Sequence, residues 1–233
     1  MKAKILDRLR GKLIVSCQAY EENPFYGAEN MVKMAQSAKL GGAEVLRICW
    51  PEQVKAVKAK MDIMIVGINK QFHEGMNILD DVFITPTYKS AVSLIEAGCE
   101  IVAMDGTLRK RTYEDLAEIV KNIKQAYPQV VLMADISTLQ EGIQCEAMGF
   151  DILSTTLSGY TRATKTNSEQ PDYDLIKQLK KHTKCLINAE GRIWSVEQLQ
   201  KVMAMEPDCV TIGSAITNPM KISEHFMKTW KGL

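Results

Sequence analysis

The sequence predicts an α/β fold, a (β/α)₈ barrel in which residues 1–233 form a single domain. Short apolar runs rich in β-branched residues recur about eight times, and longer segments of helical period separate them. The runs are continuously apolar, which is typical of parallel strands buried on both faces. Regular alternation of this kind indicates parallel βαβ connections. An open doubly wound sheet fits the same alternation, but no Gly-x-Gly-x-x-Gly follows the first run, which weakens the dinucleotide-binding alternative.

The apolar runs give the expected positions of the strands. We expect strands at residues 13–15, 45–48, 64–68, 101–104, 130–133, 152–155, 185–187 and 209–212. Amphipathic patterns predict helices over residues 113–127, 173–182 and 195–205. Ser195, with Gln198 three residues later, predicts the start of the last of these helices.

Glycines and polar segments predict the connections. Gly41-Gly42, Gly98 and Gly149 are candidate left-handed helix ends. Residues 71–87 read as an elaborated loop after the third strand, and residues 161–171 as a mobile loop after the sixth.

Composition narrows the classes of protein that the chain can represent. Hydrophobic residues make up 46% and charged residues 24%, and the formal net charge is +1, so neither nucleic acid nor an anionic membrane is an expected partner. No apolar run approaches the roughly 20 residues that span a bilayer. Residues 1–8 include basic side chains without an apolar stretch behind them, so we expect no secretion signal and a cytoplasmic protein.

Cysteine and histidine are not arranged for metal or nucleophile chemistry. No Cys-x-x-Cys pair occurs, and His73, His182 and His225 are isolated, so we expect no metal site and no Ser-His-Asp arrangement. We expect reduced core cysteines at Cys17, Cys49, Cys99, Cys145, Cys185 and Cys209.

Polar residues follow nearly every predicted strand, at the edge where a barrel forms its active site. A single polar residue there is also what any strand entering solvent shows, but the convergence of so many favours a site. The candidates are Gln18, Arg47, Lys70, Asp105, Asp135, Ser158-Gly159, Glu190 and Gly213-Ser214.

Lys70 and Glu190 are the candidates for proton chemistry. At the barrel mouth, partial desolvation favours a neutral Lys70 amine, the form that acts as a base; the alternative is a surface lysine with a buried stem. Glu190 could pair with Lys70 or a sugar hydroxyl, or form an ion pair with Arg192 or a neighbouring strand. Asp135 could instead cap the following helix, although Ser137 or Thr138 is better placed for that.

Glycines in the last two loops predict a phosphate site. Barrels commonly bind phosphate on backbone N–H groups after strands seven and eight. Here those loops carry Gly191-Arg192 and Gly213-Ser214; the glycines allow close approach and Arg192 adds positive charge.

At these residues the sequence resembles the N-acetylmannosamine-6-phosphate 2-epimerase family of bacterial sialic-acid catabolism. The resemblance runs along nearly the whole chain. Its blocks are residues 13–19, 67–70, 81–85, 133–138, 155–161, 189–192 and 213–217.

The resemblance implies a barrel of the ribulose-phosphate-binding type that interconverts N-acetyl-D-mannosamine 6-phosphate and N-acetyl-D-glucosamine 6-phosphate without a metal or organic cofactor. It implies Lys70 as catalytic acid/base and Glu190 as its partner. The other implied contacts are Gln18, Arg47 and Asp135 for the sugar, and Gly191, Arg192, Gly213 and Ser214 for the phosphate.

One position departs from the family pattern. Asn218 stands where many members of the family have an arginine, and Arg192 or Lys221 is a candidate replacement for that charge.

Two other functions remain open: an aldolase using Lys70 as a Schiff base, and a phosphosugar-binding sensor without catalysis. We also expect a homodimer. Phe226 and Trp230 near the C-terminus are candidates for its interface, with the core the favoured interpretation of both.

Overall fold

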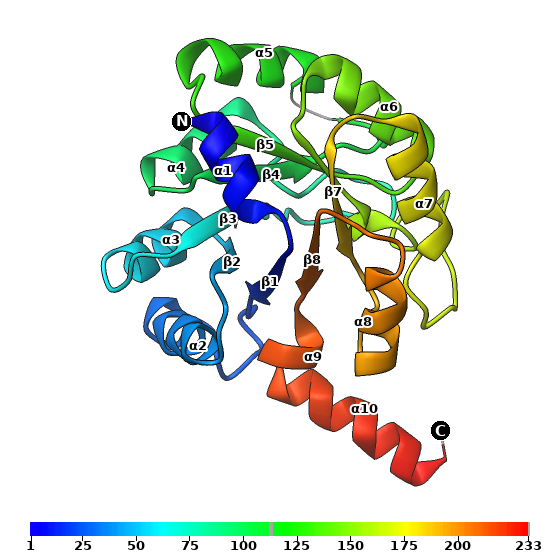
Figure 1. Ribbon diagram of the computed structural model, residues 1–233. Helices are drawn as coiled ribbons and strands as arrows, with labels where there is room; N and C mark the ends of the chain where they lie inside the picture. Colours follow the sequence, from blue (N-terminus) through cyan, green and yellow to red (C-terminus); the bar gives the residue numbers. More distant parts are fainter. Residues whose placement is uncertain (112–113, 233) are drawn as a thin grey trace.

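The computed structural model describes residues 1–111 and 114–232, and its eight parallel strands close into a barrel in the order β1 to β8 (Figure 1). The barrel and all eight strand positions predicted from the sequence are thereby confirmed. The strands are β1 (Lys12–Cys17), β2 (Val45–Cys49), β3 (Met64–Ile68), β4 (Ile101–Asp105), β5 (Val131–Asp135), β6 (Ile152–Ser154), β7 (Leu186–Glu190) and β8 (Cys209–Ile212).

Helices alternate with these strands around the outside of the barrel (Figure 1). They are α1 (Lys2–Leu9), α2 (Ala28–Leu40), α3 (Pro51–Lys58), α4 (Tyr88–Glu96), α5 (Leu116–Ala126), α6 (Leu139–Met148), α7 (Tyr173–His182), α8 (Val196–Met203), α9 (Ser214–Thr217) and α10 (Pro219–Lys231). Of the helix expected over residues 113–127, Tyr113 lies outside the described residues.

The predicted helix ends are confirmed where local chemistry specifies them. Ser195 and Gln198 form the expected capping box at the start of α8. Thr138 caps α6, so Asp135 is free for another role. Gly149 ends α6 with φ = 95°, a conformation that glycine adopts without strain.

Alternating side chains of the strands fill two apolar layers. Ile14, Val66, Ile101 and Met133 belong to the cluster inside the barrel, whereas Val15 and its counterparts pack between the strands and the helices. Helix α1 lies over the N-terminal end of the barrel, and its buried Leu9 joins the interior cluster. The interior is therefore packed, and the polar groups gather at the opposite end.

Residues 71–87 form the expected elaboration between β3 and α4. The apolar run at residues 82–84 is not a strand, since it makes only an isolated antiparallel bridge, Lys70 with Ile84. Thr85 donates its backbone N–H to Asn69 O and its hydroxyl to Ala103 O, which fixes the loop against the end of β3.

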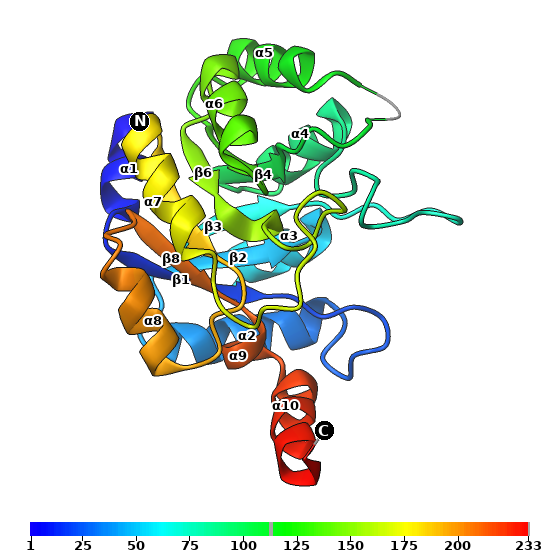
Figure 2. The same cartoon turned by 90° about the vertical axis from the view of Figure 1, so that its right-hand side faces the viewer.

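Helix α10 corrects the expectation that Phe226 and Trp230 belong to the core. Their exposed fractions are 68% and 84%, and none of residues 219–231 is buried. Figure 2 shows α10 extending away from the barrel below α9. The apolar pattern predicted burial in the core, but the barrel of this chain does not bury these side chains.

Candidate active site

A pocket of about 330 Å³ opens at the C-terminal ends of the strands. Seven of the nine site residues that the family resemblance implies line it: Gln18, Lys70, Glu190, Gly191, Arg192, Gly213 and Ser214. The other two, Arg47 and Asp135, are buried on β2 and β5; Arg47 contacts Glu190, and Asp135 contacts Arg47. The closed barrel thus brings together groups separated by up to 196 positions between Gln18 and Ser214.

Lys70 follows β3, and its half-buried side chain lies at the edge of the pocket. Its Nζ donates a hydrogen bond to the hydroxyl of Tyr20, at 2.5 Å. The Tyr20 ring in turn packs edge-on against Trp50, with ring centroids 5.9 Å apart.

Arg47, Asp135 and Glu190 form a buried ionic network beneath the pocket. The Arg47 guanidinium donates to both oxygens of Asp135, at 2.6 and 3.1 Å, and one of its nitrogens lies 3.3 Å from Glu190 Oε2. Arg47 is 1% exposed and Asp135 is fully buried, so these charges interact with little screening by water. The cation nearest to Glu190 is therefore Arg47 from across the barrel, and not Arg192.

Burial controls the protonation of this network. Burial raises the pKa of Glu190 and the charge of Asp135 raises it further, against the opposing effect of Arg47. Burial also disfavours the charged Arg47, but the two carboxylates outweigh this and raise its pKa. Arg47 therefore remains a cation, while Glu190 retains its proton to a higher pH than an ordinary glutamate.

The position of Thr156 agrees with a protonated Glu190. Its hydroxyl oxygen lies 2.7 Å from Asp135 Oδ1 and 3.0 Å from Glu190 Oε2. A hydroxyl has one proton to donate, so two ionised carboxylates could not both receive it. A protonated Glu190 donating to Thr156, with Thr156 donating to Asp135, satisfies all three groups.

The loops after β7 and β8 line the pocket with Gly191, Arg192, Gly213 and Ser214. Gly191 and Arg192 have positive φ, 114° and 56°, which turns this segment sharply after β7. Within the described residues, the N–H groups of Gly191, Arg192 and Ser214 have no hydrogen-bond partner, which leaves them available to an anion.

The Arg192 side chain has an additional structural role. Its guanidinium donates to the backbone carbonyls of Ser158 and Gln170, and lies 5.7 Å from the Tyr160 ring centroid. Arg192 therefore connects the two ends of the irregular segment after β6. This segment contains residues 161–171, which the sequence predicts to form a loop.

Gln18 and Asn218 add neutral polar atoms to the pocket. Gln18 donates to Ser16 at 2.7 Å, while its buried Oε1 has no partner in the described part of the chain and is free to accept from a ligand. Asn218 caps α10 and accepts from Asn23. Lys221 pairs with Glu224 on α10, so of the two candidate replacements for the family arginine, Arg192 is the one that lines the pocket.

The sequence did not identify Tyr20, Trp50 or Thr156 as site residues. It did suggest Asp105, at the end of β4, which has a different role. Asp105 is buried with Arg109 and Thr107, and burial raises its pKa. The Arg109 side chain also donates to Ile78 O, so this cluster ties the β3–α4 loop to β4. No pattern marked Tyr20, which lies beyond the apolar run of β1.

The cysteine thiols in the described part of the chain are mostly buried. Five of the six cysteines are buried, and burial raises the pKa of Cys17 and Cys145 to about 12, so these thiols are poor nucleophiles. No group of His, Cys, Asp or Glu within residues 1–111 and 114–232 is arranged as metal ligands. In the same residues, no helix has the length and apolar character required to cross a membrane.

Known proteins with the same fold and sequence pattern were compared with this chain. Residues 31–232 match the family model described as "Putative N-acetylmannosamine-6-phosphate epimerase". The protein named "Putative N-acetylmannosamine-6-phosphate 2-epimerase" of Caldanaerobacter subterraneus subsp. tengcongensis is 41% identical over 231 residues, covering 97% of this chain and 94% of its own. Its counterpart in Listeria welshimeri is 38% identical, covering 99% and 97%.

Solved structures agree with the sequence matches. The N-acetylmannosamine-6-phosphate 2-epimerase from Clostridium perfringens superimposes with a TM-score of 0.89 at 37% identity, over 97% of this chain and 96% of that one. Thiamine phosphate pyrophosphorylase from Pyrococcus furiosus, at 14% identity and a TM-score of 0.61, shares the fold alone. The chain therefore belongs to the N-acetylmannosamine-6-phosphate epimerase family.

Proposed function

We propose that this protein interconverts N-acetyl-D-mannosamine 6-phosphate and N-acetyl-D-glucosamine 6-phosphate, a step of bacterial sialic-acid catabolism. The observation that carries the proposal is one pocket with an amine, Lys70, and a carboxyl linked to a buried cation, Glu190 with Arg47. The free N–H groups of the β7 and β8 loops belong to the same pocket. This combination suits a sugar with a phosphate at one end and an acidic carbon at the other.

The chemistry requires the open-chain sugar, because carbon 2 is acidic only beside a carbonyl group. Lys70, as the neutral amine, removes the carbon-2 proton and becomes an ammonium group. Negative charge then develops on the carbonyl oxygen, where a protonated Glu190 and the nearby Arg47 stabilise it. A proton delivered to the opposite face of carbon 2 gives the other epimer. Either the Lys70 ammonium delivers it to the turned intermediate, or a second acid delivers it and Lys70 loses its proton to solvent.

Proton exchange with solvent tests this function. Incubation with either hexosamine phosphate in D₂O is expected to place deuterium at carbon 2 of both epimers, observed by loss of that proton signal in the NMR spectrum. Borohydride is expected to leave Lys70 unlabelled, since no Schiff base forms. Absence of both exchange and interconversion in folded protein would falsify the assignment and favour a sensor, and labelling of Lys70 would favour an aldolase.

The phosphate end of the pocket yields a prediction for Gly191. A Cβ at this position meets no atom closer than 3.9 Å, so alanine fits sterically, but φ = 114° strains any residue with a side chain. The strain displaces the N–H groups that bind phosphate. We expect Gly191→Ala to raise KM about 10-fold with a smaller change in kcat.

Two controls separate phosphate binding from general damage. Gly75→Ala introduces similar strain, at φ = 76° in an exposed loop, and is expected to leave KM unchanged. N-acetylmannosamine without phosphate is expected to react slowly and equally with the wild type and Gly191→Ala. An unchanged KM for the phosphorylated sugar in Gly191→Ala would remove Gly191 from the phosphate site.

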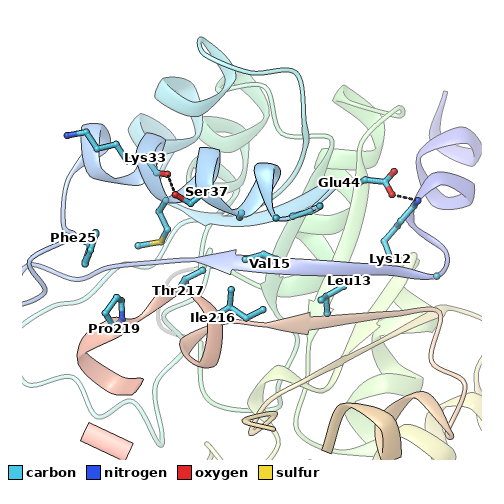
Figure 3. Close-up of a pocket in the computed structure, with 16 residues that line it drawn as sticks. Lys12, Leu13, Val15, Phe25, Lys33, Ser37, Glu44, Ile216, Thr217 and Pro219 are labelled. Carbon is cyan, nitrogen blue, oxygen red and sulfur yellow. Dashed lines mark hydrogen bonds and ion pairs between the residues drawn. The ribbon is translucent and has the colours of Figure 1, made fainter. Parts of the chain in front are cut away.

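We also propose that the protein is a homodimer in which α10 of one copy covers the barrel of the other. Figure 1 shows β1 and β8 between α2 and α8 with no helix in front of them. A groove of about 690 Å³ lies there, with Leu13 and Val15 of β1 at its floor and Ile216 beside them (Figure 3). Leu13 is 38% exposed, although the equivalent outward positions of the barrel are covered by helices.

Helix α10 of a second copy is the element that we expect to fill this groove. In a (β/α)₈ barrel the helix after β8 packs against the outer wall, but here that helix, α10, has no buried residue. Its exposed apolar side chains, Met220, Phe226, Met227 and Trp230, recur at helical spacing and form one stripe. Exchange of α10 between two copies buries both the stripe and the groove.

Analytical ultracentrifugation tests the dimer. The wild type is expected to sediment at twice the protomer mass of 26.1 kDa, and Trp230→Glu as a monomer, because a carboxylate cannot be buried in the apolar groove. Ile143→Glu, on an exposed site of α6, is the matched control and is expected to remain dimeric. A wild type that stays monomeric at micromolar concentration would contradict the proposal.

A further inference from the structure

The amine of Lys70 is held by one aromatic side chain. Its Nζ lies 2.5 Å from Tyr20 Oη and 5.0 Å from the centroid of the Tyr20 ring. A lysine side chain has a flexible four-carbon stem, so a single fixed partner decides where its nitrogen resides. Tyr20 also lines the pocket, which places this partner at the reacting end of the site.

Tyr20 is itself fixed by neighbouring rings. Trp50 and Phe72 contact it edge-on, with centroid distances of 5.9 and 6.0 Å. The Trp50 indole N–H donates to the backbone carbonyl of Lys70 at 2.9 Å. Trp50 therefore contacts the ring of Tyr20 and the main chain of Lys70 at once, and sets the position of each relative to the other.

The backbone of Trp50 is strained, which shows how firmly this position is specified. Its φ of 67° and ψ of 137° lie in a region that residues with a side chain rarely adopt. The following Pro51 restricts the backbone further. The N–H of Trp50 donates to Ile68 O at 2.8 Å, so its main-chain and indole N–H groups both bond to the C-terminal end of β3.

We propose that Tyr20 is a positioning residue for Lys70, and that Trp50 holds the pair at the substrate. The inference rests on the proposed proton transfer by Lys70. When the amine has taken the carbon-2 proton, the ammonium donates to the neutral Tyr20 hydroxyl in a charge-assisted hydrogen bond. The hydroxyl orients the nitrogen and, unlike a carboxylate, does not neutralise its charge.

Of the titratable groups near Lys70 in the described residues, only Tyr20 makes a hydrogen bond with its Nζ. Glu190 lies across the pocket, where its nearest cation is Arg47. Cys49 is close to Lys70, but burial raises the pKa of its thiol to about 11, so it remains protonated. Neither group donates to or accepts from Lys70 Nζ among the contacts of the described residues.

Tyr20→Phe tests the inference because it removes only the hydroxyl. We expect kcat to fall about 10- to 100-fold while KM changes less than about threefold, since a misplaced base slows chemistry without weakening binding. Trp50→Phe retains a ring but loses the N–H donor, and is expected to lower kcat about 10-fold in the same manner.

Tyr26→Phe is the matched control. Tyr26 also packs on Trp50, at 6.1 Å, but is 41% exposed and does not line the pocket that contains Lys70. It is expected to leave kcat and KM unchanged. Wild-type kcat in Tyr20→Phe would overturn the inference, and so would a variant that exchanges deuterium at carbon 2 without inverting it, because Tyr20 would then act on carbon directly.

A second measurement does not depend on substrate. The rate at which an acylating reagent labels Lys70 is followed at one pH by peptide mass spectrometry, in the wild type and in Tyr20→Phe. The inference predicts faster labelling of Lys70 in Tyr20→Phe, because the amine loses the hydroxyl that holds it, and no change in Tyr26→Phe. Equal labelling rates refute the link between Tyr20 and Lys70, whereas a wild type without turnover refutes only the proposed function.

Discussion

Replacement of Lys70 by alanine is expected to lower kcat about 10²- to 10⁴-fold, because the reaction then lacks the group that removes the carbon-2 proton. The fold is expected to survive, since the Lys70 side chain makes one hydrogen bond, to Tyr20, at a half-buried site. The free energy of unfolding should change by less than about 1 kcal/mol. Binding of the sugar phosphate should persist through the β7 and β8 loops.

Exchange in D₂O measures this prediction directly, and the loss of signal at carbon 2 should stop together with interconversion. Lys60→Ala is the control, because Lys60 is an exposed lysine that follows α3 and lies outside the pocket. It should retain the wild-type rate. If Lys70→Ala keeps a rate within about threefold of the wild type, Lys70 is not the base, and the proposed mechanism loses its central group.

The barrel and most of the pocket could be predicted because they depend on local patterns. A buried parallel strand is a continuous apolar run, and its C-terminal end is where polarity begins, so Lys70, Glu190 and the loop glycines could be located without contacts. Capping at Ser195 is equally local, since its partner Gln198 is three residues away.

The contacts between these residues could not be predicted, because they depend on the geometry of closure. Arg47 meets Glu190 only because β2 and β7 face each other across the barrel, and no spacing in the sequence records that distance. Tyr20 reaches Lys70 through a loop whose course depends on the rings of Trp50 and Phe72. The apolar residues of α10 were visible as a pattern, but the pattern does not show that the barrel leaves them exposed.

Opposite effects on stability are expected when the buried network loses its cation or one of its acids. Arg47→Met leaves Asp135 and Glu190 buried without a positive charge, and should lower the free energy of unfolding by about 3–5 kcal/mol. Glu190→Gln keeps the neutral pair of Arg47 with Asp135 and removes the second acid. It should leave the protein as stable as the wild type at neutral pH, or more stable.

The pH dependence of stability distinguishes Glu190 from a residue that merely packs. Its pKa is raised by burial, so the native state holds this proton to higher pH than the unfolded chain. The stabilisation is complete below the ordinary glutamate pKa and is lost as the pH rises through the raised value. Urea unfolding from about pH 4 to about pH 9 should show this decline in the wild type, and a smaller decline in Glu190→Gln.

The same substitution should lower kcat about 10²-fold, since an amide neither supplies a proton nor responds to the negative charge that develops on the carbonyl oxygen. Together, the measurements of kcat and of stability separate a catalytic role from a structural one, because removing a residue that stabilises the fold would not make the protein more stable. If Glu190→Gln instead destabilised the protein by more than about 2 kcal/mol, the carboxylate would be ionised and paired with Arg47 in the resting state. The proton shared along Glu190, Thr156 and Asp135 would then be absent, and Arg47 alone would have to stabilise the enolate.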